Sequence, residues 1–145
     1  MAPHEAYIAF LDQLAATLDE LAAIEKEKTG VVSRDDLTAL NECMKREQAM
    51  SLTLRSMDQK RMKLLKELGM ETVKLADFAA NCPEELRPEA RAATEKLRRS
   101  YAIYRSAADL ARNTLERNLR QIDAFLAEKN GEPPATEGGV RDIRV

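Results

Sequence analysis

The apolar side chains between residues 86 and 126 recur at steps of three and four, with no glycine among them. The eleven steps of this series span 40 residues, about 3.6 residues per step, which is the period of an unstrained α-helix. Such a helix is roughly 60 Å long, so the fold that contains it must be elongated. The series is Leu86, Ala90, Ala93, Leu97, Tyr101, Tyr104, Ala108, Ala111, Leu115, Leu119, Ile122 and Leu126.

Two earlier stretches have the same helical period. The second of them is predicted to span residues 34–68, with Ser33 as its N-cap and Gly69 as its C-terminal stop. The first is predicted to span residues 3–29 and to end at Gly30. Its apolar face is formed by Tyr7, Leu11, Leu14, Leu18 and Leu21.

Between the second and the last long helix, the sequence ETVKLADFAANCPEELRP predicts a short helix. Thr72 would cap it, Leu75 and Phe78 would pack, and Pro83 would end it. Three long helices with short connections must run up, down and up. Aromatic residues make up 4% of the chain and tryptophan is absent, as is typical of amphipathic helices. The predicted fold is all-α: an elongated antiparallel bundle of three long helices plus one short linking helix.

A chain of 145 residues is one domain by length. The helical bundle is predicted to occupy residues 1–129. The sequence that follows, NGEPPATEGGVRDIRV, is rich in glycine, proline and charge, so it cannot bury enough apolar area to offset its ordering entropy. Residues 130–145 are therefore predicted to form a flexible C-terminal tail.

The net charge of −2 hides an uneven distribution along the chain. Residues 1–36 hold 3 basic and 8 acidic side chains, a charge of −5, whereas residues 87–120 hold 9 basic and 4 acidic side chains, a charge of +5. The late helix can therefore attract the early helix or an acidic partner. Acidic residues are interspersed among the basic ones, so nucleic acid is excluded as a partner.

Cys43 and Cys82 form no CxxC pair, and His4 is the single histidine, so no zinc site of the usual kind is expected. Both cysteines are predicted to be reduced core residues, and no cofactor or metal is expected. The N-terminus has no basic stretch followed by an apolar run, and no window approaches 18 uncharged apolar residues. These patterns predict a cytoplasmic protein with no membrane insertion.

The sequence lacks the usual signals of a catalytic centre. It has one imidazole, and no HExxH, GxSxG or P-loop spacing occurs. The stretch NLRQID resembles part of the all-helical chorismate mutases, which bind a dicarboxylate between helices through buried basic residues. That resemblance would make Arg61 and Arg120 the ligand-binding residues, but the long helical continuation of those enzymes does not follow here. We therefore predict that the protein is not an enzyme.

The last helix has a second strip of apolar and small residues beside its main stripe. A projection at 100° per residue places in this strip Ile103, Ala107, Leu110, Thr114, Asn118 and Phe125. The strip either faces a third helix of the same bundle or accepts an amphipathic helix from another protein. Five of the six methionines, whose side chains repack readily around varied ligands, favour partner binding: Met44, Met50, Met57, Met62 and Met70.

Three motifs resemble the FlgN-type flagellar export chaperones. The stretch KRMKLLKELGM resembles a helix end of that family through Arg61, Leu64, Leu65, Leu68 and Gly69. The segment ETVKLADFA resembles the short helix that follows it, and the last helix has the spacing of Asn113, Leu115, Leu119 and Ile122. The resemblance covers about residues 7–126. It departs where the family often has paired asparagines, because only Asn113 fits.

The resemblance implies a cytoplasmic chaperone that binds no nucleotide. Its partners would be the hook-associated proteins of the hook–filament junction, bound through their C-terminal amphipathic segments, and the flagellar type III export gate. The chaperone would prevent premature assembly of this cargo and deliver it to the gate. Two alternatives stay open, a helical adaptor or coiled-coil interaction protein and a chaperone for a different flagellar cargo. Homodimerisation through Leu52 or the second strip also stays open.

Overall fold

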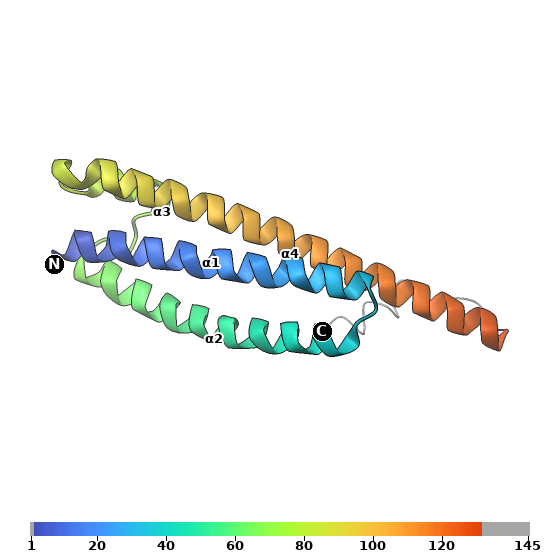
Figure 1. The fold of residues 1–145 in the computed structure, drawn as a ribbon. Helices are drawn as coiled ribbons and strands as arrows, with labels where there is room; N and C mark the ends of the chain where they lie inside the picture. Colours follow the sequence, from blue (N-terminus) through green and yellow to red (C-terminus); the bar gives the residue numbers. More distant parts are fainter. Residues whose placement is uncertain (1, 132–145) are drawn as a thin grey trace.

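The computed structural model describes residues 2–131, and in that range it is an elongated bundle of α-helices (Figure 1). The long helices are α1 (Pro3–Ser33), α2 (Leu37–Glu67) and α4 (Arg87–Asn130). Between α2 and α4 lie the short helix α3 (Leu75–Phe78) and two 3₁₀ turns, Ala79–Asn81 and Glu84–Leu86. The prediction of three long antiparallel helices and one short linking helix is confirmed.

Helix α1 is the central element of the bundle. Figure 1 shows α4 along one side of α1 and α2 along the other, and α2 and α4 make no extensive contact with each other within residues 2–131. Two opposite sides of α1 are consequently covered, which explains why it buries more than the predicted stripe of Tyr7 to Leu21. The additional buried apolar residues of its first three-quarters are Ile8, Phe10, Ala15, Ala22 and Ile24.

The main core lies at the end of the bundle where α1 begins and α2 ends. The Tyr7 ring meets the Phe78 ring edge-on, with ring centroids 4.7 Å apart, and stacks on Phe10 at 6.0 Å. Both phenylalanines are almost fully buried. Burial of one such side chain contributes roughly 1.5–3 kcal/mol. Helix α3 supplies Phe78, so this short element closes the end of the bundle, which we call the closed end.

Two predicted helix boundaries between α1 and α2 are wrong. Helix α1 continues through Gly30 to Ser33, because Val31 and Val32 are buried and their burial offsets the cost of about 1 kcal/mol for glycine in a helix. The N-cap of α2 is Asp36, whose carboxylate accepts a hydrogen bond of 3.1 Å from the Ala39 N–H. Ser33 instead donates to a carbonyl of its own helix, that of Thr29.

The end of α2 follows the sequence more closely. Gly69 adopts a left-handed conformation with φ +67°, and the Met70 N–H donates back to the Leu65 carbonyl at 2.9 Å, as in a glycine-terminated helix. The predicted cap of the short helix is wrong, because α3 starts after Lys74 and no side chain caps it. Thr72 therefore lies in the connection before the helix.

Helix α4 is longer than its neighbours. It has 44 residues, whereas α1 and α2 have 31 each. The Asn118 amide donates a hydrogen bond of 3.1 Å to the Asp35 carboxylate, which marks the level at which the α1–α2 turn meets α4. Beyond that level α4 extends past the ends of α1 and α2 (Figure 1), and we call residues 119–130 the overhang, in which Ala127 is buried. The predicted flexible tail lies, apart from residues 130 and 131, outside the described residues.

Candidate partner-binding surfaces

The second strip of α4 is only partly covered by the rest of the chain. Ile103, Leu110 and Phe125 are 50%, 55% and 64% exposed, and we call these three residues the outer strip. Within residues 2–131 no third helix covers them, because α2 packs on the far side of α1. Their exposure favours the partner-binding alternative over the intrachain one.

The other three predicted members of the strip are turned toward the bundle. Ala107 is buried within the bundle, so its side chain is not accessible to a partner in this structure. Thr114 and Asn118 are half-buried, and both make hydrogen bonds inside the chain. The Thr114 hydroxyl donates to the Leu110 carbonyl at 2.8 Å, and Asn118 donates to Asp35. These polar groups are already satisfied, and the outer strip keeps the large apolar side chains.

The overhang exposes part of the main stripe as well. Ile122 and Leu126 continue the series that is buried further back, yet they are 47% and 48% exposed. Together with Phe125 they line a shallow depression that also includes Asp35 and Asn118. Both residues belong to the main apolar series identified from the sequence. The sequence signal for their exposure was length, since the last helix was predicted to be longer than either of the other two long helices.

A second surface, which sequence reasoning missed, lies on the opposite flank of α4. Two adjacent cavities of about 290 and 550 Å³ share Tyr101 and follow one face of α1. Helix α2 forms one wall and α4 the other, and we call the two cavities together the α2–α4 groove. The sequence did contain a signal for this groove. The spacing of three and four residues that places Leu11 and Leu18 on one face of α1 continues along the helix to Glu25 and Lys28.

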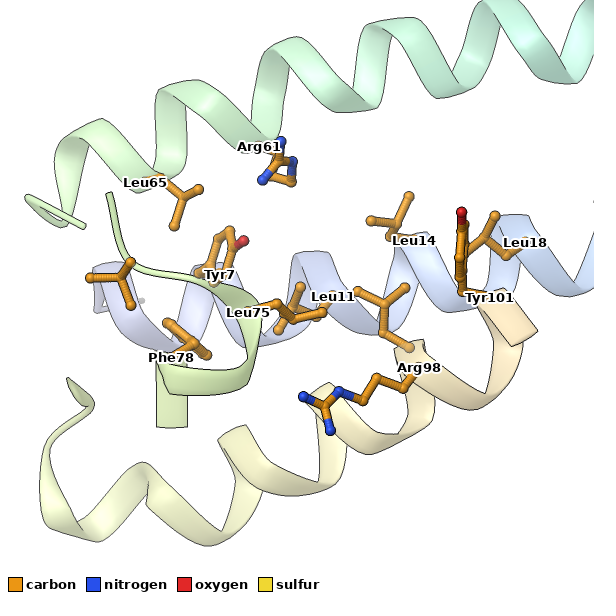
Figure 2. Close-up of a pocket in the computed structure, with 12 residues that line it drawn as sticks. Tyr7, Leu11, Leu14, Leu18, Arg61, Leu65, Leu75, Phe78, Arg98 and Tyr101 are labelled. Atoms are coloured by element: carbon orange, nitrogen blue, oxygen red, sulfur yellow. The ribbon is translucent and has the colours of Figure 1, made fainter. Parts of the chain in front are cut away.

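One end of the α2–α4 groove is almost entirely apolar. Figure 2 shows Arg61 of α2 and Arg98 of α4 on opposite walls, with leucines of α1 between them. The Arg61 guanidinium donates to Asp58 at 3.2 Å. Burial raises the pKa of Tyr7, and the nearby Arg61 charge partly opposes that shift. The apolar lining consists of Tyr7, Leu11, Leu14, Leu18, Leu65, Val73, Leu75, Phe78, Leu97 and Tyr101.

The structure does not assemble the arginine pair of the chorismate mutase resemblance. Arg61 lies at the apolar end of the groove, on the wall that faces Arg98. Arg120 lies in the overhang, 22 residues further along α4 than Arg98, which corresponds to roughly 33 Å of helix. The two arginines therefore cannot bind one small dicarboxylate.

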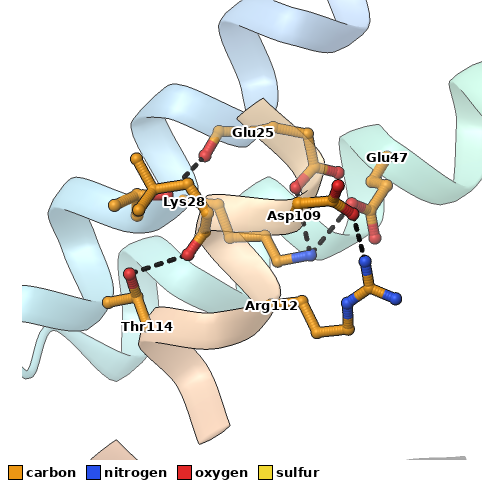
Figure 3. A network of polar contacts seen from close by, with 8 residues as sticks. Glu25, Lys28, Glu47, Asp109, Arg112 and Thr114 are labelled. Atoms are coloured by element: carbon orange, nitrogen blue, oxygen red, sulfur yellow. Dashed lines mark hydrogen bonds and ion pairs between the residues drawn. The ribbon is translucent and has the colours of Figure 1, made fainter. Parts of the chain in front are cut away.

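The other end of the groove contains a cluster of charged side chains (Figure 3). Lys28 donates to Glu47 of α2 at 2.9 Å and lies 3.5 Å from the Glu25 carboxylate. Burial, reinforced by the hydrogen bond with Glu47, raises the pKa of Glu25 to about 7, while contacts with Glu25 and Lys28 lower the pKa of Glu47. The carboxylates raise the pKa of Lys28 despite its burial. The cluster joins α1 to α2 and keeps this end polar.

The remaining chemistry-bearing residues do not converge on a site. Within residues 2–131 no group of three histidine, cysteine or carboxylate side chains could hold a metal ion. Cys43 and Cys82 are free and buried, as predicted, and burial raises the pKa of both thiols, which makes them poor nucleophiles. No described helix is long and apolar enough to cross a bilayer.

A helical bundle with an exposed apolar strip and a long open groove belongs to the class of protein-binding bundles. A family model described as FlgN protein matches residues 1–133, so the chain belongs to the FlgN family, as the sequence motifs predicted. Neither the search of curated proteins nor the search of solved structures gave a match. Membership of this family implies a role as a flagellar export chaperone, which binds flagellar proteins.

Proposed function

We propose that the protein is a cytoplasmic flagellar type III export chaperone for hook-associated proteins of the hook–filament junction. It binds their C-terminal amphipathic segments, prevents premature assembly and delivers them to the export gate. The observation that carries this proposal is the outer strip, three large apolar side chains that a member of the FlgN family leaves exposed on its longest helix.

The geometry of the outer strip suits one face of an amphipathic helix. Ile103 and Leu110 are seven residues apart, so they lie on one side of α4 about 10 Å apart along its axis. Phe125 extends the apolar surface into the overhang. A cargo helix that is unfolded before binding must be ordered at that moment, and the ordering cost keeps the complex reversible. Reversibility is what a chaperone that releases its cargo needs.

The test is a titration of the full-length chaperone with the C-terminal segment of a hook-associated protein. We expect micromolar or tighter affinity, and a loss of at least about 10-fold in Leu110→Asp, because a buried unpaired carboxylate costs more than 1.4 kcal/mol. The matched control is Leu52→Asp on α2, which replaces a leucine that is also exposed, on a different helix. Circular dichroism should remain helical in both variants.

The titration also separates the competing assignments. Equal binding by Leu110→Asp and the wild type would reject the outer strip as the cargo site. Binding of flagellin or filament cap segments in preference to hook-associated segments would reject the proposed cargo while keeping the chaperone role.

A further inference from the structure

We propose that the α2–α4 groove is a second docking surface, which takes one amphipathic helix with acidic residues at seven-residue spacing along one flank. The docked helix completes a four-helix bundle around the open face of α1. This inference concerns the flank of α4 opposite the outer strip and does not depend on which cargo the outer strip binds.

The shape of the groove fits a helix. Its floor runs along α1 from Tyr7 to Lys28, which is 21 residues or about 32 Å of helix. The walls are α2 and α4, which both pack on α1 and make no extensive contact with each other within residues 2–131. A fourth helix placed there contacts three antiparallel neighbours, as in a four-helix bundle. A partner segment of about 21 residues therefore fills the groove.

Apolar side chains line both rims. Tyr101, where the two cavities meet, is 49% exposed. On the opposite rim Met44 lines the groove, and Met62 is 18 residues further on, which is five helical turns and therefore the same face of α2. Both methionines are exposed. Flexible thioether side chains adapt to a partner's apolar stripe without a preformed pocket.

The charged side chains along the α2–α4 groove determine which kind of helix can bind there. Arg98, Arg105 and Arg112 follow one another at intervals of seven along the α4 rim, and all three line the groove. Arg98 pairs with Glu95 at 3.5 Å and Arg112 with Asp109, both as exposed contacts within one helical turn, which contribute little. Arg105 makes no ion pair with any of residues 2–131.

The basic side chains of α4 make no ion pair with α1 within the described range. The ion pairs that link α1 to a neighbour in the described range are Lys28–Glu47 and Glu27–Arg46, and both go to α2. The charged residues that line the groove are five basic side chains, Lys28, Arg61, Arg98, Arg105 and Arg112, and three acidic ones, Glu25, Asp109 and Glu116, which leaves an excess of two positive charges. An acidic flank on the docked helix complements it, which raises the association rate and fixes the register.

The charged cluster at the polar end adds a second requirement. Glu25, Lys28 and Glu47 carry a net charge of −1 when both carboxylates are ionised. An entirely apolar helix would remove water from this cluster without replacing its hydrogen bonds, which is unfavourable. The docked helix is therefore apolar over the end that contains Phe78 and has a hydrogen-bond donor at the level of Glu25.

The experiment uses two synthetic amphipathic peptides of about 21 residues that share one leucine stripe. The first has Glu at three positions spaced by seven beside the stripe, and the second has Lys there. Fluorescence anisotropy with the full-length protein should show the Glu peptide binding at least about 10-fold more tightly than the Lys peptide. The double variant Arg105→Glu/Arg112→Glu should reverse that preference.

The matched control is Arg99→Glu/Arg117→Glu, which makes the same change in net charge on the side of α4 away from the groove. It should retain the preference for the Glu peptide, and so should Leu110→Asp on the outer strip. The proposal is overturned if neither peptide binds, if both bind equally, if the control double variant loses the preference to the same extent, or if Leu110→Asp abolishes binding. The last outcome would place the peptide on the outer strip. If Leu110→Asp loses binding of the hook-associated segment but still binds the Glu peptide, the result supports two separate surfaces.

Discussion

The two ends of α4 carry one apolar repeat with opposite consequences. At the closed end the repeat consists of Ala90, Ala93 and Leu97, all buried against α1 and the α3 segment. In the overhang it consists of Ile122 and Leu126, which are about half exposed. The period is the same in both places. The comparison teaches that periodicity fixes which face of a helix is apolar, whereas a neighbouring element decides whether that face is buried.

The residue types differ as well. Alanine at positions 90 and 93, and again at 111, lets α1 and α4 approach closely where they are in contact. Beyond Ala111 the stripe changes to larger side chains, up to Leu126. The small residues mark the closest approach of α4 to α1, and the larger Leu97 fills the core at the closed end. In the overhang the large residues Ile122 and Leu126 are about half exposed.

The contrast between core and exposed phenylalanine predicts a large difference in stability between two alanine variants. Phe78→Ala at the closed end should lower the free energy of unfolding by about 3–5 kcal/mol, because it leaves a cavity beside Tyr7. Phe125→Ala in the overhang should change it by less than about 0.5 kcal/mol. Urea denaturation followed by circular dichroism measures both. Equal losses would mean that the overhang is part of the core.

A pH titration of stability tests the charged cluster between the two ends. The pKa of Glu25 is raised from 4.5 to about 7, so between these pH values the folded protein keeps a proton that the unfolded chain releases. The free energy of unfolding therefore falls as pH rises through this window, by about 2 kcal/mol. The lowered pKa of Glu47 acts in the opposite sense and below pH 4.5.

Glu25→Gln should flatten this slope, while Glu20→Gln, at an exposed position of the same helix, should leave it unchanged. Denaturation curves recorded at intervals between pH 5 and about 7.5 give the comparison. The same slope in Glu25→Gln as in the wild type would show that another group is responsible.

A pair of substitutions in one stripe separates folding from binding. Leu97→Asp should unfold the protein, because it places a carboxylate in the main core. Ile122→Asp should leave the helix content unchanged, because the side chain is about half exposed, and should weaken binding of the hook-associated segment by about 10-fold, or 1.4 kcal/mol. Circular dichroism and titration report the two effects separately. Unchanged cargo affinity in Ile122→Asp would exclude Ile122 from the cargo site.

The smallest effect concerns the boundary between the bundle and the overhang. Asn118→Ala removes the hydrogen bond to Asp35 and should cost about 0.5–1 kcal/mol. Asn113, which is exposed and lies five residues earlier on α4, provides the control, because Asn113→Ala should lower the free energy of unfolding by less. Hydrogen exchange of the overhang amides should become faster in Asn118→Ala alone. No difference between the two variants would show that the bond does not hold α4 to the α1–α2 turn.

Most of the fold could be predicted from the sequence, and the errors have local causes. The three long helices, the stop at Gly69 and the buried cysteines follow from period, turn chemistry and composition. The boundaries at Gly30 and Ser33 were wrong because the burial of Val31 and Val32 extends α1 past a residue with poor helix propensity. Local signals describe propensity, and tertiary contacts override it when the energies are comparable.

The candidate surfaces likewise combine features that follow from the sequence with features that depend on tertiary contacts. The residue pattern alone predicts that α4 is amphipathic, that it has apolar residues beyond its main stripe and that the chain resembles the FlgN family. The central place of α1 depends on how the helices pack, and because of it Ala107 is buried, Leu110 is exposed and a groove opens between α2 and α4. The physical reason is that the free energy of burying a side chain depends on which element lies next to it, and a helical period specifies a direction on one helix without naming its neighbour.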